Sequence, residues 1–183
     1  MQRNFLFLLG SGRREGNTEI LARQAAQLLP SEVEQNWLNL LDLPLPPFED
    51  IRHSVGVYPQ PAGNEKVLFD ATLAATDVVF ATPLYWYSVS SSTKLYLDYW
   101  SAWLRVPDAN FKKRMAGKTT WVVSSCSDED GERMAEPLLK MLRLSAEYMG
   151  MHWGGALLGY GSRPGDVLRH TPAMEQAGSF FKL

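Results

Sequence analysis

The chain carries the sequence FLFLLGSGRREGNT at residues 5–18, close to its amino terminus. The first five letters form a short apolar run followed by a glycine, which is typical of a buried β-strand. A helical pattern begins near Thr18, so that a loop rich in glycine and arginine joins this strand to a helix. The backbone N–H groups of such a loop and of a helix N-terminus point towards a bound anion. The stretch therefore predicts an α/β fold that holds a phosphorylated ligand.

Several side chains of this loop can donate hydrogen bonds to a phosphate. Ser11, Asn17 and Thr18 offer hydroxyl and amide donors, and Arg13 offers a charge-assisted donor. Two alternatives stay open, namely a tight glycine turn that binds no ligand and a dinucleotide-binding turn. The glycine pattern, which ends at Gly16, is one residue longer than the usual dinucleotide fingerprint, and Asp42 lies beyond the expected end of the second strand.

The composition of the whole chain excludes several classes of protein. We expect residues 1–183 to form one domain, and the formal net charge of −2 gives no reason to expect binding to nucleic acid or to an anionic membrane. Because Cys126 is the single cysteine, no intramolecular disulfide and no cysteine-based metal centre is expected. No apolar stretch approaches the roughly 20 residues of a membrane span, and the run at residues 5–9 is too short for a signal peptide. A soluble, cytoplasmic protein is expected.

Short apolar runs alternate with helical patterns along the chain. The expected strands are Phe5–Leu9, Val33–Leu40, Val78–Ala81, Thr119–Ser124 and His152–Leu158, and the expected helices are Thr18–Leu29, Glu65–Ala75, Ser91–Leu104 and Glu136–Met149. This alternation predicts a parallel sheet covered by helices on both faces, in the flavodoxin-like strand order 2-1-3-4-5. Asp42–Gly63 and Leu104–Gly117 are expected to be irregular connections, and a weak helical pattern starts at Thr171.

The loop after the third strand has the sequence TPLYWYS at residues 82–88. Three consecutive aromatic side chains at the mouth of a sheet are costly unless they cover something flat and apolar. Backbone N–H groups from Leu84 onward could meet the polar edge of a planar ring. The alternative is an aromatic cluster at a subunit interface, which applies above all to Trp86 and Tyr87.

The loop after the fourth strand has the sequence SSCSDEDGE at residues 124–132. Its small hydroxyl side chains could line the edge of a ring. The acidic residues Asp128, Glu129, Asp130 and Glu132 are better explained as a solvated cluster and the first turn of a helix than as catalytic groups. Nothing nearby in the sequence marks Cys126 as a nucleophile.

Taken together, these motifs resemble one family. Ser11-x-Arg13-x-x-Gly16-Asn17-Thr18, Thr82-Pro83-x-Tyr85-Trp86-Tyr87-Ser88 and Lys94-x-x-x-Asp98 are similar to motifs of the NAD(P)H-dependent FMN reductases and quinone reductases within the flavodoxin-like proteins. The resemblance covers roughly residues 4 to 160. It implies a three-layer flavodoxin-like domain and an FMN cofactor that takes electrons from NADH or NADPH. It also implies two-electron reduction of a quinone, a flavin or another small aromatic acceptor.

The resemblance also implies which residues bind the cofactor. Those expected at the FMN phosphate are Ser11, Arg13, Gly16, Asn17 and Thr18; those expected beside the isoalloxazine are Pro83, Leu84, Tyr85, Trp86, Tyr87, Ser124, Ser125 and Cys126. The loop at residues 124–132 departs from the glycine-containing version that is common in this family. Iron–sulfur relatives carry cysteines after the second strand, and this chain has none there. No side chain is expected to be catalytic, since the flavin carries the chemistry.

Two other functions and the oligomeric state stay open at this point. The chain could be a flavodoxin-type electron carrier without a substrate of its own, although such carriers tend to be strongly acidic, or a Rossmann-type nicotinamide-binding protein that lacks flavin. A hydrolase is disfavoured because no nucleophile elbow surrounds Ser11. Residues 94–104 are apolar around most of a helix, which predicts a homodimer or higher homo-oligomer.

Overall fold

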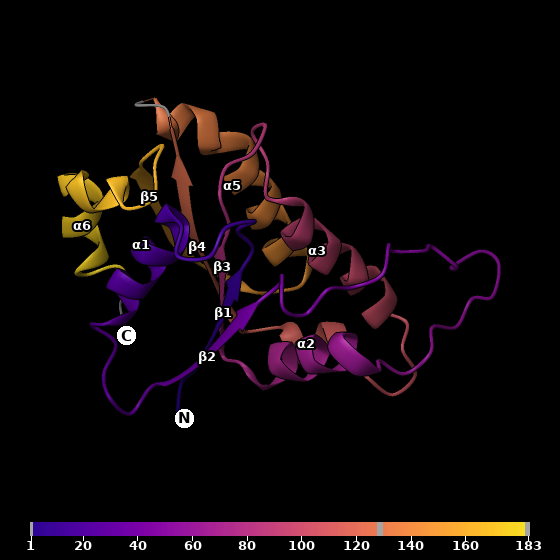
Figure 1. Cartoon of the computed structure of the whole chain (residues 1–183). Coiled ribbons are helices and arrows are strands. Elements are labelled where there is room, and N and C mark those ends of the chain that lie inside the picture. Colours follow the sequence, from indigo (N-terminus) through magenta and orange to yellow (C-terminus); the bar gives the residue numbers. More distant parts are fainter. Residues whose placement is uncertain (1, 128–129, 182–183) are drawn as a thin grey trace.

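The centre of the molecule is one sheet of five parallel strands. The computed structural model describes residues 2–127 and 130–181. The strands are β1 (Asn4–Leu9), β2 (Glu34–Asn39), β3 (Asp77–Ala81), β4 (Thr119–Cys126) and β5 (His152–Tyr160), and their order in the sheet is β2-β1-β3-β4-β5 (Figure 1). The predicted α/β class and strand order are confirmed. With this order, the chain reverses direction across the sheet between β1 and β3, where α/β proteins bind their ligands.

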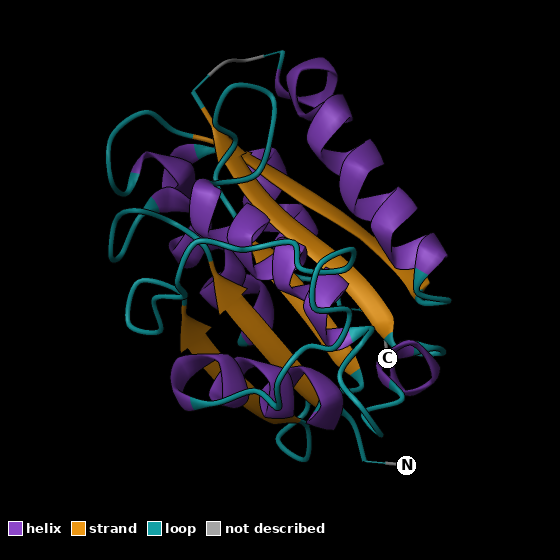
Figure 2. Ribbon diagram, turned by 90° about the vertical axis from the view of Figure 1, so that its right-hand side faces the viewer, coloured by secondary structure: helices purple, strands orange, loops and turns teal. Residues whose placement is uncertain are grey.

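Helices cover both faces of the sheet and make a three-layer sandwich (Figure 2). They are α1 (Asn17–Ala26), α2 (Gly63–Ala74), α3 (Ser91–Trp103), α4 (Phe111–Met115), α5 (Gly131–Tyr148), the 3₁₀ turn η1 (Asp166–Arg169) and α6 (Thr171–Ala177). One buried cluster joins the sheet to α1 and α6, and a second joins it to α2, α3, α4 and α5. Among these described helices, none is both long and apolar enough to cross a membrane.

Three elements differ from the sequence prediction. α5 begins at Gly131, five residues before the predicted Glu136, and carries Pro137 in its interior. Proline favours the first turn of a helix, which is why the sequence pattern places the start beside it. The buried side chain of Ala135 holds the additional turn in place. The short helix α4 and the turn η1 lie where the sequence shows no helical period, because both have fewer residues than two helical turns.

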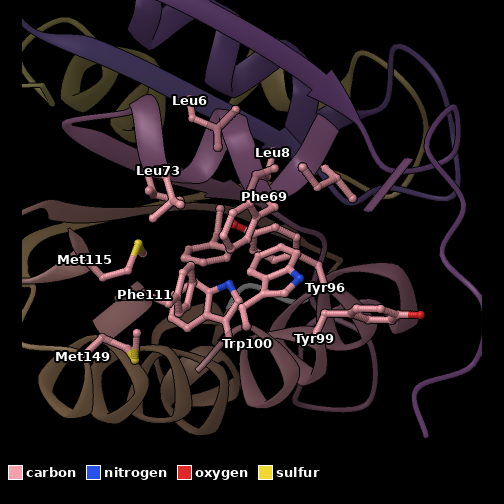
Figure 3. Packing of buried hydrophobic residues seen from close by; sticks show 14 of the residues in the cluster. Leu6, Leu8, Phe69, Leu73, Tyr96, Tyr99, Trp100, Phe111, Met115 and Met149 are labelled. Carbon is pink, nitrogen blue, oxygen red and sulfur yellow. The ribbon is translucent and has the colours of Figure 1, made fainter. Parts of the chain in front are cut away.

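The core between the sheet and α3 is built from aromatic side chains (Figure 3). Trp100 and Trp103 project from α3 and meet the rings of Phe69 and Phe111 at centroid distances of 5.4 to 5.9 Å, and the Tyr96 ring lies 5.6 Å from that of Trp103. The hydroxyl groups of Tyr96 and Thr72 lie 2.6 Å apart, and burial raises the pKa of Tyr96 to about 12. The aromatic excess of the chain therefore forms the layer on which α3 is fixed beside the sheet.

The loop after β1 lies directly against the start of α3. The hydroxyl of Ser92 donates to the carbonyl oxygen of Gly10 at 3.1 Å. A Cβ atom at Gly10 would stand 1.9 Å from Thr93 Oγ1, so no side chain can be accommodated there. The absence of a side chain at residue 10 thus lets the candidate phosphate loop reach the helix that follows the aromatic loop.

Candidate functional site

The loops that follow β1, β3 and β4 meet around one pocket at the carboxyl edge of the sheet. The pocket has a volume of about 260 Å³. Ten of the predicted site residues line it, namely Ser11, Arg13, Gly16, Asn17, Thr18, Pro83, Leu84, Tyr85, Ser125 and Cys126. The four remaining lining residues, Ser127, Gly161, Ser162 and Pro164, were not predicted. The fold therefore brings together four stretches that are more than 30 residues apart in the sequence.

The loop after β1 presents backbone donors without partners. Within the described part of the chain, no acceptor is bonded to the N–H groups of Gly12, Arg14, Gly16, Asn17 and Thr18. The N-cap residue of α1 is Gly16, which provides no side-chain cap. The first N–H groups of a helix need an acceptor from outside it, and a cap or a ligand can supply one. This loop is therefore a ready cradle for an anion.

The charges around the pocket also suit an anion. Among the described residues that line the pocket, none is an aspartate or a glutamate, and one is Arg13, which has no ion-pair partner in the described part of the chain. The neighbouring Arg14 pairs with Asp42, which raises the pKa of the guanidinium and lowers that of the carboxyl group, mainly through their hydrogen bonds. This exposed pair ties the loop after β1 to the segment after β2, so Asp42 acts on the loop from outside the pocket.

The amide group of Asn17, which was predicted to donate to a phosphate, is hydrogen-bonded within the protein. Its amide nitrogen donates to the carbonyl oxygens of Gly161 at 2.8 Å and Arg163 at 2.9 Å. An amide group has two N–H donors, so neither is left for a phosphate. Its oxygen accepts the N–H of Val167 at 3.4 Å. Asn17 can therefore contribute only its backbone N–H to the anion cradle.

The loop after β4 joins the phosphate loop through two hydroxyl groups. Thr18 Oγ1 and Ser125 Oγ lie 2.6 Å apart, and because one hydrogen satisfies this contact, the other can be donated to a ligand. Ser124 is 1% exposed and does not line the pocket, which corrects its predicted place at the ring edge. Successive residues of a strand point to opposite faces, so Ser124 and Ser125 cannot both reach it.

The acidic residues of this loop are only partly described. Asp128 and Glu129 lie outside the described residues. Asp130 forms an ion pair with Arg133, and Glu132 lies in the first turn of α5. The expectation of an acidic first helical turn is confirmed for Glu132, since a carboxylate there is favoured by the helix dipole.

The aromatic loop after β3 is a tight hairpin turn. Tyr85 and Ser88 exchange two backbone hydrogen bonds, at 2.9 and 3.0 Å. Trp86 and Tyr87 have φ angles of 48° and 62°, the left-handed region that a two-residue hairpin turn requires and that glycine or asparagine usually occupies. Trp86 is 94% exposed. Large side chains in a strained and exposed turn point to a role in binding rather than in stability.

The turn lines a second pocket, which adjoins the first. This pocket of about 220 Å³ is bounded by Leu84, Trp86, Tyr87, Cys126, Ser127 and Met134. Leu84, Cys126 and Ser127 line both pockets. Trp86 and Tyr87, which were predicted beside the ring system, line this second pocket and not the first. Of the described residues that line the second pocket, none is charged and two are aromatic.

Most backbone N–H groups of the aromatic loop are already bonded within the protein. Leu84 donates to the carbonyl oxygen of Ser125 at 3.1 Å, and Tyr85 donates to that of Ser88. The expectation that N–H groups from Leu84 onward are free is therefore wrong for these two residues. In the described structure, Trp86 and Tyr87 keep unbonded N–H groups, because the central residues of a hairpin turn do not pair with the strands.

The sequence contains a signal for the lining residues that follow β5, although these residues were not predicted. The run Gly161-Ser162-Arg163-Pro164-Gly165 follows β5 directly and shares its glycine, serine and arginine composition with the loop after β1. All strands are parallel, so both runs leave the sheet at the same edge. Residues 161–164 lie next to the first loop because Asn17 binds them.

The sheet topology also separates the predicted alternatives. A Rossmann-type nicotinamide-binding domain has the strand order 3-2-1-4-5-6, whereas this sheet has the order 2-1-3-4-5. The reading as a Rossmann-type protein is therefore wrong. A flavodoxin-type carrier and a flavin reductase share the observed topology, so comparison with known proteins has to distinguish them.

Known proteins with similar sequences are flavin enzymes. Residues 4–156 match the family of NADPH-dependent FMN reductases. The curated relative YwqN of Bacillus subtilis strain 168, named as an NAD(P)H-dependent FMN-containing oxidoreductase, is 33% identical over 174 residues. This alignment covers 94% of this chain and 93% of the relative.

Solved structures show the same fold. A Trp repressor binding protein from Bacillus subtilis superposes with a TM-score of 0.77 at 29% identity, and the alignment covers 97% of each chain. An azoreductase from Bacillus anthracis strain Sterne superposes with a TM-score of 0.67 at 16% identity, over 97% of this chain and 98% of the other, and shares the fold alone. With an anion cradle at the switch point of a flavodoxin-like sheet, this chain belongs to the family of NADPH-dependent FMN reductases, oxidoreductases that use FMN and NAD(P)H.

Proposed function

We propose that the pocket at the carboxyl edge of the sheet holds FMN, with its phosphate in the loop after β1 and its ring system towards the aromatic turn. The observation that carries this proposal is the set of unbonded N–H groups at residues 12, 14, 16, 17 and 18, beside Arg13 and with no carboxylate among the described lining residues. A dianionic phosphate supplies the acceptors that these donors require.

We further propose that the second pocket takes the electron acceptor. Leu84, Trp86, Tyr87 and Met134 line it with apolar and aromatic side chains, Cys126 and Ser127 add small polar ones, and none of the described lining side chains is charged. A flat, neutral, aromatic molecule fits such walls better than a charged one, because aromatic rings stack on each other and desolvated charges need partners. The lining of the second pocket therefore favours a quinone, a free flavin or another small aromatic acceptor. The overall reaction converts NAD(P)H, a proton and a quinone into NAD(P)⁺ and a hydroquinone.

The residues of this chain orient the reactants rather than react themselves. When bound, FMN supplies the chemistry that accepts a hydride from NAD(P)H and passes two electrons on. The N–H groups of Trp86 and Tyr87 are available to the polar edge of the ring system. None of His53, His152 and His170 lines either pocket, so we assign no histidine a role in proton transfer.

The visible absorbance spectrum tests this function directly. Purified protein mixed with FMN and freed of excess ligand should show flavin bands near about 375 and 450 nm. Anaerobic NADH or NADPH should bleach these bands, and a benzoquinone should restore them. Stopped-flow traces with a quinone, free FMN and an azo dye then rank the acceptors by their rate of reoxidation.

Each departure from this result has a definite meaning. Flavin that binds but is not bleached by either nicotinamide would contradict the reductase and favour the electron carrier. Protein that takes up no flavin would contradict the proposed ligand of the phosphate loop. Reoxidation by free FMN alone would reject the quinone as acceptor and retain the enzyme class.

We also propose a homodimer that forms across α3 and α5. An apolar groove of about 630 Å³ runs between these helices, and the exposed Leu144 and Tyr148 border it. Monomeric soluble proteins rarely expose apolar surface of this kind. Light scattering coupled to gel filtration at micromolar concentration should give twice the mass of 20.6 kDa. The monomer mass would contradict the proposal, and Leu144→Asp should convert a dimer to monomers.

A further inference from the structure

The segment after β5 closes the phosphate pocket, although the sequence motifs of the site do not include it. Gly161, Ser162 and Pro164 line the pocket beside Ser11 and Thr18. The family match ends at residue 156, so this segment lies outside the part of the chain that the family comparison covers. Residues 161–164 therefore add to the pocket from beyond the span that the family model matches.

Asn17 fixes the position of this segment. The side chain is 8% exposed and forms three hydrogen bonds, to Gly161, Arg163 and Val167. A Cβ at Gly161 would stand 2.6 Å from the amide nitrogen of Asn17 and 2.8 Å from the backbone nitrogen of Val167. The approach is thus close enough to require glycine at residue 161. The first residue of α1 thereby connects the phosphate loop to the carboxyl-terminal turn.

Asp166 shapes the turn itself. Its carboxylate accepts the backbone N–H groups of Ser162 at 3.2 Å and Arg163 at 2.7 Å. These bonds and the guanidinium of Arg169 lower the pKa of Asp166. Because the backbone N–H groups of Ser162 and Arg163 are bonded within the turn, the donors that these two residues can offer to a ligand are their side-chain groups.

Two such groups have no partner among the described residues. No hydrogen bond or ion pair is formed by the hydroxyl of Ser162 or the guanidinium of Arg163, and both residues are exposed. The nearby Arg169 is paired with Asp166 instead. Ser162 lines the pocket, and Arg163, which does not line it, stands between the lining residues Ser162 and Pro164. A hydroxyl and an unpaired cation so placed are the donors that a phosphate would recruit.

We propose that residues 161–164 form an additional wall of the phosphate site, in which Ser162 and Arg163 bind the phosphate and Asn17 positions the turn that carries them. This inference rests on the proposed function, because the phosphate is that of FMN. It assigns to the carboxyl-terminal segment a share of the preference for FMN over the unphosphorylated riboflavin. Asn17 is a positioning residue, since its side chain acts through the turn.

The test compares FMN with riboflavin, which has the same ring system and lacks the phosphate. Flavin fluorescence titrations would be made with the wild type, Ser162→Ala, Arg163→Ala and the control Lys113→Ala. Lys113 is exposed in α4, at the opposite edge of the sheet, and its replacement removes the same charge. We expect Arg163→Ala to weaken FMN about tenfold and Ser162→Ala less, with riboflavin affinity unchanged and the control unaffected.

Asn17→Ala separates positioning from direct binding. If Asn17 acts through the turn, the double variant Asn17→Ala, Arg163→Ala should lose no more FMN affinity than Asn17→Ala alone. Hydrogen–deuterium exchange of the ligand-free protein should rise at residues 161–167 in Asn17→Ala and stay unchanged in β1. Multiplying losses, or unchanged exchange at residues 161–167, would overturn the role of Asn17.

The outcomes also separate this inference from the proposed function. If the wild type binds FMN and both turn variants bind it equally well, the additional wall is wrong and the function stands. An equal loss of FMN and riboflavin affinity would overturn the assignment to the phosphate. If the wild type binds no FMN, the function fails and the phosphate assignment fails with it, while hydrogen exchange still decides whether Asn17 positions the turn.

Discussion

Thr18 and Ser125 lie in hydroxyl contact, with 2.6 Å between Thr18 Oγ1 and Ser125 Oγ. The pair joins the first turn of α1 to the end of β4, across 107 residues of sequence. Thr18 is 2% exposed, so its hydroxyl has little access to water. The contact therefore fixes the distance between the loop proposed for the phosphate and the loop proposed for the ring edge.

The first prediction concerns this pair. Ser125→Ala and Thr18→Val should each weaken FMN binding about fivefold, because a buried hydroxyl contact is worth about 1 kcal/mol. The double variant should bind FMN about as weakly as either single variant, since each change already breaks the same contact. Fluorescence titration measures all four proteins. Losses that simply multiply would show that the two hydroxyl groups act independently.

The second prediction concerns the glycines of the phosphate loop. Gly10→Ala should lower the free energy of unfolding by about 1–3 kcal/mol, because its Cβ would overlap Thr93 Oγ1 at 1.9 Å. Gly12→Ala is the matched control, since a Cβ there meets nothing within 4 Å and should change stability by less than about 0.5 kcal/mol. Urea denaturation measures both. Equal stabilities of the two variants would contradict the close packing of this loop on α3.

The third prediction concerns the aromatic turn. Replacing Trp86 with Asn and Tyr87 with Gly should raise the free energy of unfolding by about 1 kcal/mol, because these residues suit the two positive φ angles. The same change should raise the KM for a quinone by removing two walls of the second pocket. Asp108→Gly is the control, since Asp108 has a φ of 61° and lines neither pocket. An unchanged KM in the turn variant would show that Trp86 and Tyr87 do not bind the acceptor, whatever the strain of the turn.

The fourth prediction uses the single cysteine as a reporter. Cys126 lines both pockets, so bound FMN should cover it. Saturating FMN should slow the reaction of this thiol with a coloured disulfide reagent by about tenfold or more, in line with the burial of most of a ligand's surface in its site. Labelling is followed by absorbance at several FMN concentrations, and the half-effect should coincide with the Kd from fluorescence. A labelling rate that does not depend on FMN would place the flavin elsewhere.

The fifth prediction concerns pH. Burial lowers the pKa of His170 from its usual 6.5, and its ring packs edge-on against Tyr160 at 4.3 Å. The unfolded chain then takes up a proton at a higher pH than the folded protein, so stability falls as pH drops below about 6.5 towards the lower folded pKa. Burial raises the pKa of Glu65, which acts in the opposite direction at more acidic pH. His170→Gln should remove the loss just below pH 6.5 in urea denaturation, and an unchanged pH profile would contradict this assignment.

The sequence alone predicted most of the fold, for a simple reason. Short apolar runs and amphipathic periods are local patterns, and right-handed crossovers leave few ways to connect five of them. The runs at residues 5–9 and 78–81 both became buried central strands. Patterns fail where elements are short or atypical, as in α4, η1 and the extra turn of α5 around Pro137. That residues 1–183 form one domain stays a prediction.

The sequence by itself also determined that the loops after β1, β3 and β4 meet, because parallel strands that run in the same direction end at one edge of the sheet. It identified Ser11, Arg13 and Tyr85 as residues of the pocket. Only the tertiary structure decided the direction of individual side chains. It turned Asn17 towards Gly161, buried Ser124 and brought residues 161–164 to the pocket. The reason is physical: a side chain bonds whichever partner the packed backbone places within about 3 Å, and that partner can lie 144 residues away in sequence.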